Sequence, residues 1–478
     1  MTDKINQDRK RGVSKVATGN SGLDEITGGG LPARRPTLLC GGAGSGKTLT
    51  AMEFLVNGVL DFDQNGVFLT FEESREELYD NFVSLGFDIN ELEQSRRITV
   101  RVIDPDHQEH VEVGNYSLAG LFSQLDLAID AVKARRVVID GIENLFSIFS
   151  RQTVIRKEIK RLFKWLKQKG VTSIITLEQG SRPGSLTRHG IEEYIADCVI
   201  FLDHRMEGQI ATRRLRIVKY RGTGHGTNEY PFLITDKGIS VFPVTSLALD
   251  HNAPVERVTT GSEQLDALFG GQGYYKGSSV LISGTAGTGK SSLAACFAKA
   301  VCDGGGRCIY FAFEESERQI IRNMGRTGSA LDAHVRQGLL KIHAVRPMLL
   351  GLEMHLLSMH DMIRDFKPAA VILDPISNLE AIGEHLDIKL MFIRLFDYLK
   401  RNNITALFTC LTRGNSMEES TEIGISSVMD TWILLRQHLR DRRRERSLYI
   451  MKSRGMHHDS DIHAFDITDQ GIKINPVS

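Results

Sequence analysis

The sequence predicts an α/β fold with two tandem domains, each a mainly parallel sheet flanked by helices with antiparallel strands at one edge. A glycine-rich motif occurs twice, as GGAGSGKT at 41–48 and as GTAGTGKS at 284–291. Each copy follows a short apolar run and precedes a helical stretch, which is the context in which this motif forms a phosphate-binding P-loop. We therefore expect two P-loop NTPase domains in one chain.

The 478-residue chain contains one long internal repeat. FLTFEES at 68–74 returns as YFAFEES at 310–316, and RRVVIDGIENLF at 135–146 matches AAVILDPISNLE at 369–380. Several blocks that recur in the same order cannot arise from composition bias. The chain is therefore expected to be a duplicated domain of about 240 residues rather than a short-period solenoid.

The repeat predicts four segments, namely a flexible N-terminus at 1–15, a first domain at 16–247, a linker at 248–256 and a second domain at 257–478. Within each copy, short apolar runs alternate with helical stretches, which is typical of βαβ units and of a parallel sheet covered on both faces. The late runs CVIFLDH (198–204) and WILLRQH (432–438), with the strands after them, are expected to be antiparallel additions to that sheet.

Composition argues against several classes of protein. Lys plus Arg and Asp plus Glu number 59 each, so no overall positive charge favours binding to DNA or to an anionic membrane. The chain has no run of 18 apolar residues, so we expect no membrane span. The six cysteines include no C-x-x-C pair, which favours free thiols over a zinc site or a disulfide framework. The polar N-terminus, without an apolar signal region, predicts a cytoplasmic protein.

The two glycine-rich motifs predict nucleotide binding. Backbone N–H groups of such loops turn toward phosphate oxygens, and the dipole of the following helix adds to the attraction. We expect each lysine to reach the β and γ phosphates of ATP, and the Thr or Ser after it to bind Mg²⁺. The residues predicted to contact nucleotide in this way are Gly44, Ser45, Gly46, Lys47, Thr48 and Leu49, and Gly287, Thr288, Gly289, Lys290, Ser291 and Ser292.

Carboxylates complete each predicted site. Asp140 and Asp374 end apolar strands at the edge of the sheet where ligands bind, so they are candidates for binding Mg²⁺ together with Thr48 and Ser291. Hydrolysis also needs a carboxylate that orients or deprotonates the attacking water. The candidates are the glutamates that end the strand after each P-loop helix, Glu72 with Glu73 and Glu314 with Glu315. The alternatives are helix caps for the aspartates and solvated strand ends for the glutamates.

Cationic side chains occur late in each copy, far along the chain from their own P-loop. In a ring of such domains, cations of this kind reach the γ-phosphate held by the next subunit, as an arginine finger does. The candidates are Lys219 and Arg221 in the first copy, and Lys452 and Arg454 in the second. An ordinary basic hairpin is the alternative. His225 is a further candidate contact, although a histidine in such a segment is more often a surface residue than a ligand.

Two P-loops, paired glutamates and a late K-x-R-G segment in each copy together resemble the KaiC family of clock ATPases and autokinases, which have RecA-like domains. The resemblance extends from Val16 to Ile474. It implies a homohexamer of two stacked rings with ATP at the subunit interfaces. It also implies that the first ring hydrolyses ATP, while the second transfers phosphate to its own Ser or Thr residues and can remove it. A KaiB-like protein or a signalling kinase is the implied partner.

The resemblance assigns roles by position. It assigns the catalytic glutamates of the first ring to Glu72 and Glu73, and those of the second ring to Glu314 and Glu315, one of which acts as base toward the protein hydroxyl. The four late cations match contacts made in trans, and Arg446 matches a further cation near the second nucleotide. The phosphoacceptor pair matches Ser426 and Ser427, although two serines before a strand are more often turn residues.

Two departures from the family pattern affect these expectations. The chain stops at KINPVS without the family's long regulatory tail, which puts regulation by a KaiA-type activator in question. The family's tryptophan near the second adenine falls at Thr327, so base stacking there is altered. We therefore expect a role in circadian-type or stress signalling, and we favour stress or two-component signalling over timekeeping.

The alternative function is a hexameric DNA-dependent ATPase of the RecA or DnaB kind, which shares the same core chemistry. Such a motor needs basic or aromatic loops that face a central channel, and the candidate is RDRRRER at 440–446. A third interpretation is a non-catalytic scaffold whose nucleotide only controls assembly. The glutamates and lysines present in both halves favour an enzyme over a scaffold.

Overall fold

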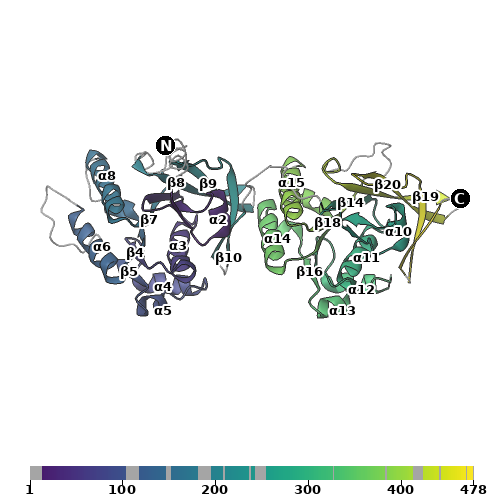
Figure 1. Ribbon diagram of the computed structural model, residues 1–478, viewed down its shortest axis with the longest axis horizontal. Helices are drawn as coiled ribbons and strands as arrows, with labels where there is room; N and C mark the ends of the chain where they lie inside the picture. The colour runs from purple at the N-terminus through teal and green to yellow at the C-terminus, as the bar shows by residue number, and fades with distance from the viewer. Residues whose placement is uncertain are drawn as a thin grey trace, which may run out of the picture. The chain divides into compact units, whose positions relative to one another are not determined.

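The computed structural model describes residues 13–103, 118–146, 152–180, 195–207, 210–235, 238–242, 254–326, 328–382, 385–412, 424–440, 443–469 and 471–476. The chain divides into two compact units, Met1–Ser246 and Leu247–Ser478 (Figure 1). Most of the expected flexible N-terminus and much of the expected linker at 248–256 lie outside the described residues. Lys15 is already part of a short strand, β1 (Lys15–Val16), which pairs with β2 (Leu31–Pro32).

The first unit is built on a sheet whose described strands follow the order β11-β10-β9-β8-β3-β7-β6-β4-β5. The parallel part consists of β3 (Pro36–Gly41), β4 (Gly66–Thr70), β5 (Ile98–Val102), β6 (Arg136–Asp140), β7 (Thr172–Glu178) and β8 (Cys198–Glu207). The antiparallel part consists of β9 (Ile210–Tyr220), β10 (Glu229–Thr235) and β11 (Gly238–Val241). This combination confirms the α/β fold with a mainly parallel sheet.

Helices cover both faces of this sheet (Figure 1). They are α2 (Ser21–Ile26), α3 (Lys47–Phe62), α4 (Arg75–Val83), α5 (Ile89–Gln94), α6 (Ala119–Val132), α7 (Ile142–Phe146) and α8 (Gln152–Lys169). Successive strand residues point to opposite faces. Leu39 therefore joins the core under α3 and α4, whereas Leu38 and Cys40 join the core under α6 and α8. Both faces are apolar because both are covered, as expected for a parallel sheet.

The second unit repeats this architecture with strand order β16-β15-β17-β18-β14-β19-β20-β21-β22. The strands of this sheet are β14 (Ser279–Gly284), β15 (Cys308–Ala312), β16 (Leu340–Ala344), β17 (Ala370–Asp374), β18 (Thr405–Leu411), β19 (Thr431–Arg440), β20 (Arg443–Ser453), β21 (His463–Thr468) and β22 (Gly471–Pro476). Its helices are α10 (Glu263–Leu268), α11 (Lys290–Asp303), α12 (Glu317–Gly325), α13 (Asp332–Arg336), α14 (Leu352–Phe366) and α15 (His385–Arg401). The matching strand orders confirm two tandem RecA-like domains.

The expectation that CVIFLDH and WILLRQH are antiparallel strands was wrong. The strand β8 runs parallel to β3, and β19 runs parallel to β14; only the strands after them turn back. An apolar pattern indicates a strand but carries no information about the direction of its pairing. The connection at 179–197, which leads from β7 to β8, is long enough for the crossover that parallel strands require.

None of the helices in the described ranges combines the length and the apolar character that a membrane span needs.

Candidate nucleotide-binding sites

Each P-loop connects a central strand to a long helix. In the first domain the loop leads from β3 to α3, and in the second from β14 to α11. The residue before each helix is a glycine in the left-handed region, Gly46 at φ 94° and Gly289 at φ 105°. Glycine is needed there because other residues adopt this conformation only with strain. It also provides no side-chain cap, so the first N–H groups of α3 and α11 stay available to an anion.

The P-loop lysines lie at the centres of their loops. Lys47 Nζ donates to the carbonyl oxygens of Gly41 and Gly42 at 3.1 and 3.0 Å. Lys290 Nζ donates to those of Gly284 and Thr285 at 2.9 and 2.8 Å. Burial lowers the pKa of Lys290. Both ammonium groups are therefore held where the loop would enclose phosphate.

The other residues predicted to contact nucleotide differ in their exposure to solvent. Gly44 and Gly287 are exposed at the turn, while Ser45 and Thr288 are buried beneath it. Leu49 is buried in the core, so only its backbone can contact a nucleotide, and Ser292 is half-buried at the start of α11. Sequence spacing alone cannot separate these layers, because it does not show which way each side chain points.

The aspartate of the first domain lies beside the P-loop threonine. Thr48 Oγ1 is 3.3 Å from both carboxylate oxygens of Asp140, and Thr176 Oγ1 donates to Asp140 Oδ1 at 2.7 Å. Burial raises the pKa of Asp140. A buried carboxylate facing a hydroxyl matches the oxygen ligands that Mg²⁺ prefers, so Thr48 and Asp140 fit the expected metal position.

The equivalent aspartate of the second domain has one partner that Asp140 lacks. Asp374 accepts hydrogen bonds from the Tyr310 hydroxyl and from the Thr409 hydroxyl. The repeat places Phe68 at the position of Tyr310, so the first domain lacks this phenol. A cavity of about 230 Å³ lies over this site. Its lining includes Lys290, Ser291, Glu314, Glu315 and Asp374.

The two glutamates of each pair have different surroundings. Glu73 accepts a hydrogen bond from Asn81 at 3.4 Å, and Glu315 accepts one from Asn323 at 3.1 Å. These asparagines occupy equivalent positions on α4 and α12, and sequence analysis did not single them out. The first glutamate of each pair, Glu72 or Glu314, makes no such bond to these asparagines.

The carboxylate of Glu72 lies at the rim of the first site. A Cβ atom at Gly141 would come within 2.4 Å of Glu72 Cγ, so the glycine after Asp140 leaves room for this side chain. Although Glu72 is exposed, partial loss of hydration, and then the charge of Asp140, raise the pKa of its carboxyl. A raised pKa favours acceptance of a proton from water.

Two of the late cations of the second domain contact the predicted phosphoacceptor segment of their own chain. Lys452 Nζ donates to the backbone carbonyl of Ser426 at 2.7 Å, and an Arg454 Nη atom donates to that of Ser427 at 2.6 Å. The Ser427 side chain is exposed and that of Ser426 is half-buried. Thr327 lies outside the described residues.

Arg446 lies at the P-loop of its own chain, where its Nε donates to the Gly287 carbonyl at 3.2 Å. Gln437, which sequence analysis did not single out, donates to the same oxygen at 3.0 Å. The basic run at 440–446 is at the turn between β19 and β20, and residues 441–442 lie outside the described residues. The hairpin thus brings one cation of this run to the loop.

The corresponding cations of the first domain lie at the end of β9. Arg221 is exposed, with an Nη atom 3.9 Å from Asp197, and Lys219 is half-buried. His225 is half-buried, and its Nδ1 is 3.0 Å from the Gly226 carbonyl. The segment that would correspond to the phosphoacceptor segment begins within 181–194, outside the described residues.

A comparison with known proteins agrees with this geometry. The KaiC ATPase family model matches residues 16–246 and 258–478. The chain belongs to the KaiC family. It is 48% identical over 462 residues to "Circadian clock protein KaiC2" of Synechocystis sp., which covers 96% of this chain and 81% of the relative. It is 37% identical over 473 residues to "Circadian clock oscillator protein KaiC" of Synechococcus elongatus, which covers 98% and 91%.

Membership of the KaiC family confirms the resemblance stated from the motifs. It also identifies the chain as a KaiC-type ATPase that binds ATP.

Proposed function

We propose that this KaiC-family ATPase divides its chemistry between its domains. The first domain hydrolyses ATP, and the second also transfers the γ-phosphate of ATP to Ser426 and Ser427. The observation that carries the proposal is the contact of Lys452 and Arg454 with the backbone of these two serines. Both cations are thus bound to the backbone of the two residues whose hydroxyls would receive a phosphate, which supports the assignment of this segment as the acceptor.

In the proposed hydrolysis, Lys47 and the N–H groups at the start of α3 hold the phosphates, and Glu72 takes a proton from the attacking water. Thr48 and Asp140 would hold Mg²⁺, which neutralises charge on the phosphate oxygens when it is bound. The raised pKa of Glu72 brings its proton affinity closer to that needed at neutral pH. Glu73, bonded to Asn81, would position this strand end rather than react.

Hydrolysis by the first domain is tested with Glu72→Gln and Glu73→Gln in a Lys290→Ala background, which silences the second site. We expect phosphate release to fall by about 10²-fold, the size expected for loss of a general base. Glu76→Gln, an exposed change on α4, is the matched control and should leave the rate unchanged. An unchanged rate in the double variant would show that Glu72 and Glu73 are merely solvated.

In the proposed autokinase reaction, the serine Oγ forms a bond to the γ-phosphorus as the bond between that phosphorus and ADP breaks. The serine proton passes to Glu314 or Glu315. Neither Ser426 nor Ser427 lines the second-site cavity of its own chain. A neighbouring subunit would therefore supply the ATP and the glutamate, which supports a homohexameric ring.

The autokinase proposal is tested by intact-mass measurement and phosphopeptide mapping after incubation with Mg·ATP. Ser426→Ala with Ser427→Ala should abolish phosphate incorporation and leave first-domain hydrolysis intact, because the acceptors do not contribute to that site. Ser460→Ala, an exposed serine outside the acceptor segment, is the control. Phosphate on other residues, or on none, would refute the autokinase reaction and leave the ATPase standing.

We also propose that the protein acts in stress or two-component signalling, with a KaiB-like protein or a signalling kinase as partner. The residue at position 327 supports this proposal, because a threonine stands here where the clock members of the family have a tryptophan. The test is deletion of the gene, followed by measurement of rhythmic expression and of stress survival. Loss of rhythm with normal stress survival would contradict the proposal.

A further inference from the structure

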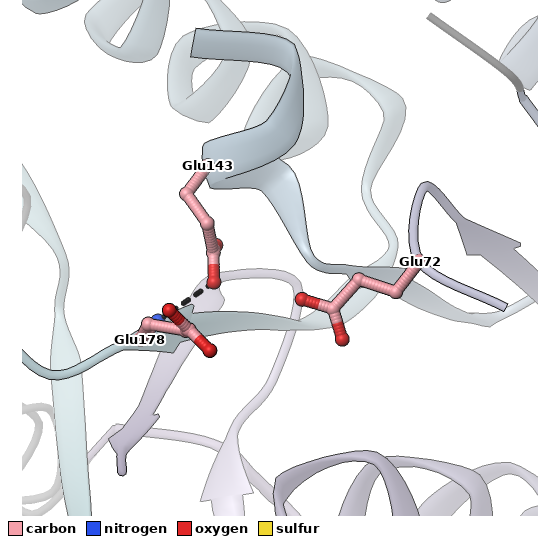
Figure 2. A group of neighbouring side chains, drawn as sticks. All are labelled: Glu72, Glu143 and Glu178. Atoms are coloured by element: carbon pink, nitrogen blue, oxygen red, sulfur yellow. Dashed lines mark hydrogen bonds between the residues drawn. The ribbon is translucent and has the colours of Figure 1, made fainter. Parts of the chain in front are cut away.

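Three carboxylates converge beside the first nucleotide site, and only that of Glu72 was predicted from the sequence to be a site residue (Figure 2). Glu72 follows β4, Glu143 lies on α7 and Glu178 ends β7. One carboxylate oxygen from each lies within 4.8 Å of the others. Glu72 and Glu178 are exposed, whereas Glu143 is only 5% exposed. One ligand group of the cluster is therefore buried, and the other two are open to solvent.

One carboxylate oxygen of Glu143 accepts a hydrogen bond from the backbone, and the other accepts none among the described residues. Its Oε1 accepts a hydrogen bond from the Glu178 backbone N–H at 2.9 Å. Its Oε2 is buried and has no hydrogen-bond partner among the described residues. A buried carboxylate oxygen without a partner costs free energy, so this atom lacks a ligand that would compensate it.

The second domain shows that the fold itself does not require a carboxylate here. The repeat places Ser377 at the position of Glu143 and Leu411 at that of Glu178. Ser377 Oγ accepts a hydrogen bond from the Leu411 backbone N–H at 3.2 Å, which is the same backbone contact. A serine therefore suffices for the structural bond, and the extra oxygens of the first domain are available for another purpose.

Negative charge in this cluster is poorly compensated. Within the described ranges, none of the three glutamates forms an ion pair with Lys or Arg. Burial, and then the neighbouring charge of Glu72, raise the pKa of Glu143 to about 7. The pKa of Glu72 is also raised, because partial burial and the charge of Asp140 outweigh the positive charge of Lys47, which lowers it. A divalent cation would remove this repulsion.

We propose that Glu72, Glu143 and Glu178 form a divalent-cation site, separate from the Thr48–Asp140 magnesium position. Hard cations take carboxylate oxygens at about 2.1 Å for Mg²⁺ and about 2.4 Å for Ca²⁺, so two oxygens on opposite sides of one ion lie about 4–5 Å apart. The three oxygens of the cluster all lie within 4.8 Å of one another, which is compatible with that range. The open side leaves room for water molecules to complete the coordination shell. We expect Ca²⁺ or Mn²⁺ rather than Mg²⁺, because Mg²⁺ demands stricter geometry.

The site is tested with Mn²⁺, whose free concentration is measured by electron paramagnetic resonance, on the full chain without nucleotide. We expect one Mn²⁺ per chain at the cluster, and at least about tenfold weaker binding in Glu143→Gln, which removes a charged ligand. Glu178→Gln should weaken binding in the same way. Glu76→Gln, an exposed change on α4 outside the cluster, is the matched control and should bind as the unmodified chain does.

A thermal melt provides a second measurement. Mn²⁺ should raise the melting temperature of the unmodified first domain but not that of Glu143→Gln, and this separates a lost site from a misfolded variant. Equal Mn²⁺ affinity in the unmodified chain, Glu143→Gln and Glu178→Gln would overturn the proposal. The proposal would also be overturned if Asp140→Asn abolished Mn²⁺ binding and the two glutamate variants did not. Because no nucleotide is present, the binding measurement does not depend on the proposed ATP chemistry, and failure of this site would not refute that chemistry.

Discussion

Replacing Glu143 by Gln should remove a large part of the pH dependence of first-domain stability. The side chain is buried, and the pKa of its carboxyl in the folded protein is about 7, against an ordinary value of 4.5. Below pH 4.5 the group is protonated in both the folded and the unfolded chain. As the pH rises from 4.5 to 7, the unfolded chain releases this proton first, so the free energy of unfolding decreases.

The size of the effect follows from the two pKa values. A difference of about 2.5 pH units, at about 1.4 kcal/mol for each, corresponds to about 3.5 kcal/mol. The full stability is present below pH 4.5, and the loss is complete above pH 7. Gln has nearly the same shape and does not ionise, so Glu143→Gln should gain about 3.5 kcal/mol over the unmodified chain between about pH 4 and pH 8.

Denaturant unfolding followed by tryptophan fluorescence measures this difference. The chain has two tryptophans, and Trp432→Phe in both proteins leaves Trp165 on α8 as the reporter of the first domain. Trp165 stacks on Phe122, with 5.1 Å between ring centroids, so its emission responds to loss of that core. The buffer contains a chelator, because a bound cation would stabilise the charged carboxylate.

Glu53 provides a matched control. It is buried on α3, accepts a hydrogen bond from the Ile239 N–H at 3.1 Å, and burial raises its pKa to about 7 as well. Glu53→Gln should therefore show a similar pH effect, but Mn²⁺ should suppress only the effect of Glu143. A stability difference between Glu143→Gln and the unmodified chain that stays constant from about pH 4 to pH 8 would refute the reasoning.

Three further results are expected. Tyr310→Phe should destabilise the second domain by about 1.5–3 kcal/mol, because Asp374 loses a buried hydrogen bond. The measurement is denaturant unfolding followed by Trp432 fluorescence in a Trp165→Phe background. Unchanged stability would show that the Tyr310 hydroxyl is not needed there. Light scattering with Mg·ATP should give a hexamer, since Lys452 and Arg454 would then reach a neighbouring site, and a monomer at saturating ATP would contradict the ring. Single-stranded DNA should not stimulate ATP hydrolysis, given the balanced charge of the chain. Stimulation that decreases steeply with salt would favour the DNA-motor alternative.

The sequence by itself determined the duplication, the α/β class, the two P-loops and the KaiC resemblance. These features depend on short contiguous segments. The P-loop, for example, needs glycines, a lysine and a helix start within eight positions, and its chemistry comes largely from the backbone. Asp140 and Asp374 could be located for the same reason, since each ends an apolar strand whose position follows from the repeat.

Only the tertiary structure decided which distant side chains lie together. The direction of β8 and β19 depended on long connections rather than on the apolar pattern. Glu143 and Glu178 are neighbours because β6 and β7 are adjacent parallel strands, and their carboxyl ends meet at one edge of the sheet. Comparing the two copies shows Ser377 in place of Glu143, but not that Glu143 is buried with an unpartnered oxygen. Burial and convergence are properties of the packed sheet, because they depend on which strands become neighbours.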